Sequence, residues 1–284
     1  MIEIAKRNIR LFFRDRTAVF FSSLSVILII GLYVLFLGDM IAGSMGETPE
    51  ARFLIDSWIV AGLVASSSVT ATLGALGIIV DDYTKNVIKD LYSAPLKKST
   101  LIGGYLISSF SIGIIMSCLT LVLGEIYIIV NGGQLLSLFD LIKVLGVIVL
   151  STFANSAILF LIISFIRSQS AFGTFSTIIG TVIGFLMGIY VPVGNLPVYV
   201  QKIVKIFPGS YSVSLFRNII MDKPMGIAFN QAPENLVNDF VLSMGIDIQV
   251  SGITITPVLS VIILLATGFL FYLISIFRLR TKKA

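Results

Sequence analysis

The sequence predicts an all-α integral membrane protein with six transmembrane helices. Hydrophobic residues make up 56% of the 284-residue chain and charged residues 12%, and the mean hydropathy is +1.01. These values exclude an ordinary soluble domain. Apolar blocks near the length that crosses a hydrocarbon core of about 30 Å recur along the chain. They predict one transmembrane domain over residues 1–284, with spans at residues 20–38, 54–80, 101–130, 141–166, 171–190 and 257–277.

The placement of lysine and arginine predicts the orientation of these spans. Fourteen of the twenty basic residues fall on one side of the predicted membrane, together with five acidic residues. Because basic residues collect on the cytoplasmic side, we expect a multi-pass protein of a bacterial plasma membrane with both termini in the cytoplasm. The net charge of +5 then reflects topology and indicates no nucleic-acid partner. The fourteen residues are Lys6, Arg7, Arg10, Arg14, Arg16, Lys85, Lys89, Lys97, Lys98, Arg167, Arg278, Arg280, Lys282 and Lys283.

Several kinds of site are not expected from the composition. The chain has no histidine and one cysteine, Cys118, so the sequence predicts no metal site, no haem site and no intramolecular disulfide. Gly103-Gly104 lacks the lysine of a phosphate-binding loop, and no nucleophile-elbow motif occurs. We therefore expect no catalytic residue and no cofactor bound by this chain. If ATP powers transport, ATP and Mg²⁺ bind to a separate ATPase.

The residues before the first span, 1–21, predict an amphipathic interfacial helix. Apolar residues recur there at helical spacing, and five basic residues lie largely on the other face. A helix of this kind lies in the membrane interface with its basic side chains toward anionic lipid headgroups. Two interpretations stay open: a basic anchor for the first span, or a helix that also contacts a cytosolic partner.

The loop between the second and third spans, residues 81–99, predicts a short cytoplasmic helix. Apolar residues recur at helical spacing among charged residues, and a proline ends the pattern. A small apolar face ringed by charges suits insertion into a groove on a partner, and a solvated loop is the alternative. The candidate docking residues are Val87, Ile88, Lys89, Leu91, Tyr92 and Pro95.

Residues 191–256 predict a re-entrant external hairpin followed by an external insertion. Pro208-Gly209 separates two amphipathic pieces, 198–207 and 211–220, that are too short to cross a bilayer. Irregular backbone at membrane depth must be buried in protein or line an aqueous cavity, so the hairpin is either an external gate or a passive interfacial element. In the insertion, Pro233 predicts the start of a helix, and residues 246–250 predict extended chain. The candidate hairpin residues are Pro192, Leu196, Pro197, Pro208 and Arg217.

Small residues, hydroxyl residues and one acid are the candidate site residues within the spans. Small residues let helices approach closely, and hydroxyl groups bond across helix interfaces. These residues therefore either pack helices, within one subunit or between two copies, or line a translocation path. Glu125 is the only acid well inside a predicted span, with water or Tyr127 as its expected partner, and its role is structural or functional. The candidates are Ser67, Thr70, Thr72, Gly180, Gly184 and Glu125.

Three motifs of this chain resemble those of type-2 ABC exporter permeases. In that family the loop between spans two and three often has the form D-x-E-x-G-T-x-x-x-L-x-x-x-P, and Asp82, Leu91 and Pro95 match it. Asn86 replaces the glycine, and asparagine is the next-best residue for left-handed backbone. The acid and the threonine of the motif are replaced by Thr84 and Val87.

The other two motifs flank the first and fifth spans. Arg14-Asp15-Arg16 is similar to the R-D-[PR] sequence that ends the interfacial helix of the family. The longest match lies after the fifth span, where the family has G-x-x-x-P-x-x-x-L-P and then, at fixed distances further along, a proline and an arginine. It begins at Gly188 and is met by Pro192, Leu196, Pro197, Pro208 and Arg217.

The resemblance implies an ABCG-like fold and the permease subunit of an ABC exporter. It implies that residues 81–99 carry the coupling helix, which seats on a cytosolic ABC ATPase, and that a second copy or a paralogous permease completes the transporter. Spans one, two and five would line the cavity. Its weakly charged lining favours hydrophobic or amphipathic cargo such as a peptide, toxin, antibiotic or drug. The alternatives are export of a lipid or a lipid-linked glycan, a motorless channel or secondary transporter, and a scaffolding protein.

Overall fold

The structure, a computed structural model, describes residues 1–17, 19–20, 31, 48–93, 98–230, 232–250 and 252–281. Within these ranges α-helices dominate, and five of them are long and apolar enough to span a membrane. Five of the six predicted spans are thus confirmed as helices, and the span predicted at 20–38 lies almost wholly outside the described residues. The five are α4 (Pro49–Thr84), α6 (Lys98–Val130), α7 (Leu138–Ile163), α8 (Gln169–Leu186) and α13 (Pro257–Thr281).

Polar caps define where three of these helices begin. The Thr48 hydroxyl accepts a hydrogen bond from the Ala51 N–H at 3.2 Å, and Pro49 follows as the first helical residue. Ser137 caps α7 and Ser168 caps α8 in the same way. A side-chain oxygen at this position satisfies one of the N–H groups that the first helical turn leaves without a partner. Each of these three helices therefore begins directly after a polar capping residue.

α4 is the central helix of the bundle. It packs against α6, α7, α8 and α10 (Pro208–Ile220), and α13 packs against α7 and α10. Most of the large buried cluster comes from these helices. Apolar side chains of α13, among them Val258, Phe269 and Phe277, stay exposed, as expected where a helix faces lipid.

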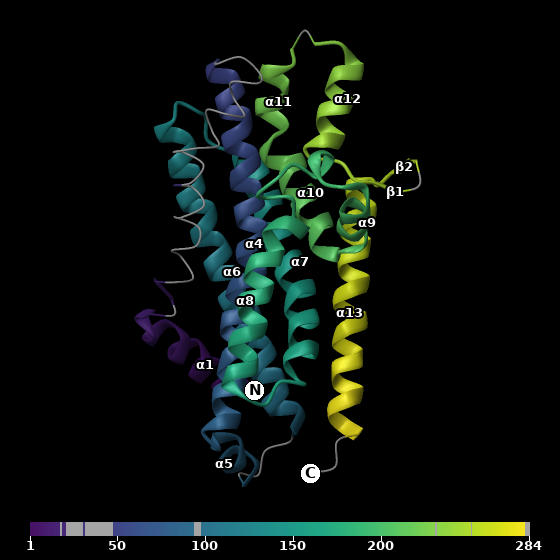
Figure 1. Cartoon of the computed structure of the whole chain (residues 1–284). Helices are drawn as coiled ribbons and strands as arrows, with labels where there is room; N and C mark the ends of the chain where they lie inside the picture. Colours follow the sequence, from purple (N-terminus) through teal and green to yellow (C-terminus); the bar gives the residue numbers. More distant parts are fainter. Residues whose placement is uncertain are drawn as a thin grey trace.

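The shorter elements gather at the two ends of the bundle (Figure 1). One end carries α1 (Ile2–Arg14), α5 (Val87–Ser93) and the last turns of α13; we name it the basic end. The opposite end carries the predicted hairpin and insertion. Their elements are η2 (Val193–Asn195), α9 (Val198–Ile206), α10 (Pro208–Ile220), α11 (Asp222–Ala228), α12 (Glu234–Ser243), β1 (Gln249–Val250) and β2 (Ile253–Thr254).

The short elements differ from the sequence predictions in detail. α1 ends at Arg14, and residues 16–17 and 19–20 are also helical, so the extent of the interfacial helix predicted at 1–21 stays a prediction. α12 begins directly after Pro233, as predicted. The extended chain predicted at 246–250 includes β1, which pairs with β2 in an antiparallel hairpin whose register joins Val250 to Ile253. Each strand of this hairpin has two residues, so the described part of the fold is built almost wholly from helices.

Candidate functional site

Two short helices make up the predicted external hairpin. α9 has nine residues and α10 has thirteen, so neither can span a membrane. Pro197 directly precedes α9, and Pro208 is the first residue of α10, where a missing N–H costs nothing. Pro192 precedes η2 and Leu196 follows it. Both predicted half-helices are therefore present, while their re-entrant course and gating role stay predictions.

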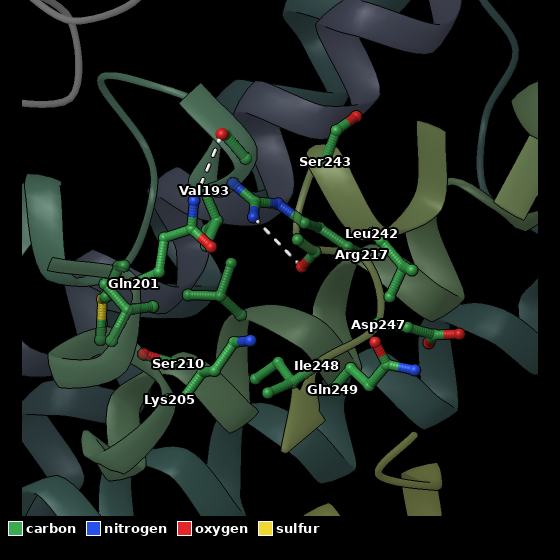
Figure 2. Close-up of a pocket in the computed structure, with 15 residues that line it drawn as sticks. Val193, Gln201, Lys205, Ser210, Arg217, Leu242, Ser243, Asp247, Ile248 and Gln249 are labelled. Carbon is green, nitrogen blue, oxygen red and sulfur yellow. Dashed lines mark hydrogen bonds between the residues drawn. The ribbon is translucent and has the colours of Figure 1, made fainter. Parts of the chain in front are cut away.

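Arg217 lies at the centre of this end and is 1% exposed. Its Nη1 donates hydrogen bonds to the carbonyl oxygens of Met244 at 2.8 Å and Gly245 at 3.3 Å; Figure 2 shows the bond to Gly245. Its Nη2 donates to the Gly188 carbonyl at 2.7 Å. The guanidinium also lies 4.4 Å from the ring centroid of Trp58, whose Nε1 donates to the Met244 carbonyl at 2.8 Å. One buried side chain thus joins α10, the end of α8, α4 and the turn after α12.

Left-handed backbone presents these carbonyl groups to Arg217. The φ angle is +58° at Gly188 and +65° at Gly245, a region that is costly for residues with a Cβ atom. A Cβ atom on Gly245 would also lie 3.1 Å from Arg217 Nη1. The sequence motif identified Arg217, but its partners are backbone groups whose presentation depends on turn geometry. No side-chain pattern could have identified them.

Ser67 and Thr72 lie buried in helix interfaces of α4. Thr120 Oγ1, on α6, donates to Ser67 Oγ at 3.0 Å, and Thr72 Oγ1 donates to the Ser68 carbonyl at 2.6 Å. Asn155 Nδ2, on α7, donates to Ser68 Oγ at 2.9 Å. Hydroxyl groups that bond within and between packed helices are typical of helix-packing residues. This geometry favours the packing interpretation for Ser67 and Thr72.

Thr70, Gly180 and Gly184 differ in how closely the rest of the chain packs against them. Thr70 is half-buried, and its hydroxyl donates to the Ser66 carbonyl at 3.2 Å. A Cβ atom on Gly184 would collide with the Tyr190 ring, so this glycine permits the tight turn at the end of α8. A Cβ atom on Gly180 would meet no atom of the described chain within 4 Å. Gly180 and Thr70 therefore remain candidates for contact with a second copy or with cargo.

Two carboxyl groups, Asp56 and Glu125, lie near the end of the spans that carries the hairpin. Glu125 Oε2 accepts a hydrogen bond from the Leu136 N–H at 3.2 Å. The Tyr127 hydroxyl donates to Asp56 Oδ1 at 2.9 Å. Asp56 is buried in α4, and the sequence analysis did not select it because it lies close to the start of a predicted span. A functional role for Glu125 stays a prediction.

At the basic end, a left-handed turn at Asn86 leads into α5. Its φ angle is +60°, so the conformation expected where the family motif has glycine is confirmed. Only Lys85 and Asn86 separate the last residue of α4 from Val87, the first residue of α5. The direction of α5 is therefore set by a turn of two residues attached directly to the central helix.

The predicted docking residues of α5 do not all face outward. Ile88 is 5% exposed and thus buried within the chain itself, and Val87 and Leu91 are half-buried. Lys89 is exposed. The exposed face of α5 therefore bears Lys89, Asp90 and Ser93 rather than the apolar stripe. The Tyr92 side chain and all of Pro95 lie outside the described residues.

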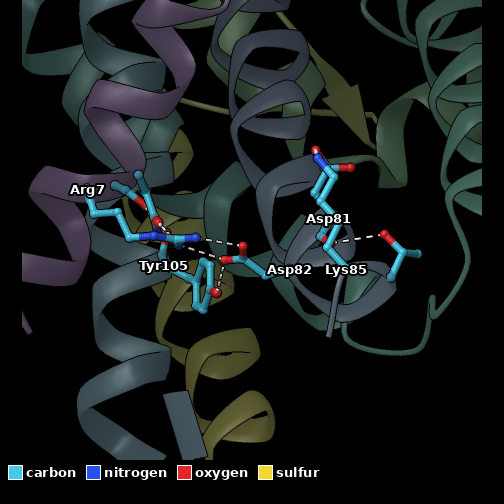
Figure 3. Close-up of polar contacts among 8 residues, drawn as sticks. Arg7, Asp81, Asp82, Lys85 and Tyr105 are labelled. Atoms are coloured by element: carbon cyan, nitrogen blue, oxygen red, sulfur yellow. Dashed lines mark hydrogen bonds and ion pairs between the residues drawn. The ribbon is translucent and has the colours of Figure 1, made fainter. Parts of the chain in front are cut away.

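A bidentate ion pair joins α1 to the end of α4 (Figure 3). Arg7 Nη1 and Nη2 donate to the two carboxylate oxygens of Asp82, each at 2.7 Å, and the Tyr105 hydroxyl of α6 donates to Asp82 Oδ2 at 2.5 Å. The Asp82 side chain is 5% exposed and that of Arg7 is 33% exposed. The hydrogen bond with Asp82, supported by the charge of that carboxylate, raises the pKa of the Arg7 guanidinium despite partial burial. The sequence analysis matched Asp82 to a motif but did not identify either partner.

Close packing of α1 on α6 places Arg7 beside Asp82. A Cβ atom on Gly104 would lie 2.6 Å from Ile4 Cβ, which means that only glycine permits this approach. Asn8 is buried beside the ion pair, where its Oδ1 accepts from Arg7 Nη1 at 2.9 Å and its Nδ2 donates to Ser108 Oγ at 3.3 Å. We name Arg7, Asp82 and Tyr105 the basic-end cluster. It fixes α1, α4 and α6 to one another directly before α5.

We expect Arg217→Met to lower the free energy of unfolding by at least about 3 kcal/mol. Several buried carbonyl oxygens lose a charged donor, and each unsatisfied buried group costs about 1–3 kcal/mol. Arg217→Lys should retain part of the stability that Arg217→Met loses, because an ammonium group keeps the charge but lacks the planar set of donors and the stacking on Trp58. Unfolding in detergent, followed by the emission of Trp58, measures both variants. Lys202→Met, at an exposed position of α9, is the control; equal stability of the two methionine variants would contradict the structural role of Arg217.

Arg7→Gln should destabilise the protein by about 1–3 kcal/mol, since it leaves the buried Asp82 carboxylate without its cation. Breaking a fully buried ion pair costs about 3–5 kcal/mol, and the partial exposure of Arg7 reduces this value. Adding Asp82→Asn should restore part of the stability, because it removes the uncompensated charge. Thermal unfolding and protease protection of α1 are the measurements. Arg10→Gln, on the exposed face of α1, serves as the matched variant, and an equal effect of Arg7→Gln and Arg10→Gln would show that the ion pair contributes nothing.

Comparison with known protein families gives a match that agrees with this geometry. The family described as ABC-2 type transporter matches residues 1–221, which include α1, α5 and α10. A comparison with curated proteins finds no match. Permeases of this family are membrane components that work with ABC ATPase subunits and do not themselves hydrolyse ATP. With the match over most of its length and its apolar spanning helices, the chain belongs to the ABC-2 type transporter family, as a multi-pass membrane permease subunit.

Proposed function

We propose that this permease subunit belongs to an ATP-driven exporter and that its basic end is cytoplasmic and receives the ABC ATPase. The observation that carries the proposal is the basic-end cluster. It ties α1 to α4 and α6 through a buried carboxylate, and α5 begins two residues after α4 ends. A force applied to α5 would therefore act on three helices together instead of bending a flexible loop.

The packing of α5 supports a role in transmitting this force. Because Ile88 is buried within the chain and Leu91 packs against the main core, a partner that displaces α5 would also displace the residues beneath it. The exposed Lys89, Asp90 and Ser93 are the side chains that would contact the ATPase. In a complex of two permease chains and two ATPase subunits, ATP binding would close the ATPases and rock the bundles between inward-facing and outward-facing states.

The chemistry of α8 supports a hydrophobic or amphipathic cargo, such as a peptide, toxin, antibiotic or drug. α8 contains no aspartate, glutamate, lysine or arginine. Its exposed side chains combine apolar groups such as Ile178 and Val182 with the hydroxyl groups of Thr177 and Thr181. A path lined by this helix would offer no charged group to an ion. The hydroxyl groups would satisfy the polar groups of an amphipathic molecule.

Lys89→Glu should weaken ATPase binding about tenfold, because reversing a charge within a docking face places like charges opposite one another. The measurement is the fraction of the cognate ABC ATPase that co-purifies with the permease, together with ATP-linked export. Lys202→Glu makes the same change at an exposed site on the opposite end and should leave co-purification unchanged. If both variants retain the ATPase and export at the level of the unmodified protein, the ATPase docks elsewhere.

Cysteine labelling should place the two ends on opposite sides of the membrane. In a Cys118→Ser background, which removes the single native cysteine, an impermeant maleimide should label Lys202→Cys in intact cells. Lys89→Cys should react only after the membrane is permeabilised, because basic residues concentrate at its end of the bundle. Labelling of Lys89→Cys in intact cells would overturn both the orientation and the docking proposal.

A further inference from the structure

The end opposite α5 contains a cavity of about 290 Å³ between the hairpin and the insertion. On the hairpin side, Val193, Val204 and Val213 contribute apolar walls, and on the insertion side Leu242 and Ile248 do so. Ligand sites typically begin at about 300 Å³ and combine an apolar lining with a few placed polar groups. The cavity has the size of a site for a small ligand and a lining of this kind.

Lys205 brings a positive charge into the cavity. Figure 2 shows its Nζ directed toward the middle of the space. Within the described residues, no acceptor or carboxylate partners this Nζ. Asp247 also lines the cavity, but its carboxylate is turned away from Lys205 (Figure 2), and its Oδ1 accepts from Asn218 Nδ2 at 3.2 Å. The half-buried ammonium of Lys205 therefore faces the cavity without an intramolecular counter-ion.

Other donors in the walls already bond to the protein. Gln201 Nε2 donates to the Leu196 carbonyl at 2.9 Å, and Ser210 Oγ donates to the Leu186 carbonyl at 3.0 Å. Arg217 uses its Nη atoms on backbone carbonyls, although its charge still adds to the positive potential of the wall. Lys205 is thus the group that remains to bind a ligand. An anionic group suits it, because charged hydrogen bonds are the strong ones.

We propose that this cavity binds a small apolar carboxylate. The ligand carboxylate accepts hydrogen bonds from Lys205 Nζ, and the apolar body lies against the valines of the hairpin and against Leu242 and Ile248. This chemistry is shared by a short-chain fatty acid and by the C-terminal residue of an apolar peptide. A bound ligand contacts both the hairpin and the insertion and holds the two together. The proposal does not depend on where the ATPase docks.

Trp58 allows the proposal to be tested by intrinsic fluorescence. It is the single tryptophan of the chain, and its ring stacks on Arg217, which lines the cavity. The full-length protein, in nanodiscs of zwitterionic lipid, is titrated with hexanoate, hexanol and hexylammonium. We expect a saturable change of Trp58 emission with hexanoate, at least about tenfold weaker binding of hexanol, and no saturable binding of hexylammonium. Loss of one charged hydrogen bond accounts for a factor of this size.

Variants on α9 separate the role of Lys205 from a general effect of charge. Lys205→Gln should weaken hexanoate binding about tenfold or more, and Lys205→Arg should retain it. Lys202→Gln, at an exposed position of the same helix, should bind hexanoate like the unmodified protein. Tyr211 bonds to the backbone carbonyl of residue 205, so these changes leave that contact in place. The starting emission of Trp58 reports whether each variant is folded.

A second pair of probes distinguishes the source of the carboxylate. N-acetyl-leucine mimics the C-terminal residue of an apolar peptide. N-acetyl-leucinamide has the same apolar side chain, but its carboxamide replaces the charged carboxylate. Tighter binding of N-acetyl-leucine than of hexanoate supports a peptide terminus, and the reverse order supports a fatty acid. Equal responses to the acid and the amide would overturn the proposal. So would hexanoate binding that is unchanged in Lys205→Gln, or an emission change that occurs only when anionic phospholipid is added to the nanodiscs.

Discussion

The buried carboxylate of Asp82 is the constraint on which the arrangement of the basic end depends. Removing a charge from water costs several kcal/mol unless it is paired and hydrogen-bonded. Asp82 is therefore stable at the end of α4 only while Arg7 and Tyr105 contact it. Arg7 reaches it because α1 lies close against α6, and that approach requires Gly104. The packing of α1 against α6 and against the end of α4 thus depends on satisfying one charge, directly before the turn that leads into α5.

α4 connects this end to the other without an intervening loop. Its 36 residues give a length of about 54 Å at a rise of 1.5 Å per residue, well beyond the approximately 30 Å of a hydrocarbon core. Trp58 near its start stacks on Arg217, and Asp82 near its end bonds to Arg7. In the proposed exporter, a displacement of α5 would therefore reach the hairpin through a single helix that is held by a buried cation at one end and by a buried anion at the other.

Local sequence signals predicted the elements that depend on local physics. Apolar blocks identified the five spanning helices that the structure describes, Pro208 marked the break between α9 and α10, and Asn86 marked the left-handed turn before α5. Long-range contacts were not predictable in this way. Arg7 and Asp82 are 75 positions apart, and which of many charged residues meet is decided only when the helices pack.

The candidate site shows a second limit, which concerns amphipathic faces. Periodicity indicates that a helix has an apolar face, but it does not say whether the same chain or a partner covers that face. In α5 the chain itself covers Ile88, so the exposed face is the polar one. The same limit applies to Arg217. The sequence identified its charge within an apolar segment, but it could not identify the backbone carbonyl groups that accept its hydrogen bonds. Side-chain patterns identify candidates for burial, and the packing of distant segments decides what buries them.

The distribution of burial also constrains where a cargo could pass. α4 is enclosed by α6, α7, α8 and α10, and its hydroxyl residues Ser67 and Thr72 are used in packing. A path between two permease chains must be lined by surfaces that a single chain leaves exposed. α8 has such a surface, since Thr177, Gly180 and Thr181 are exposed there. In the proposed exporter, the fifth span would therefore contribute more of the cargo path than the second, which would serve as the rigid element that moves it.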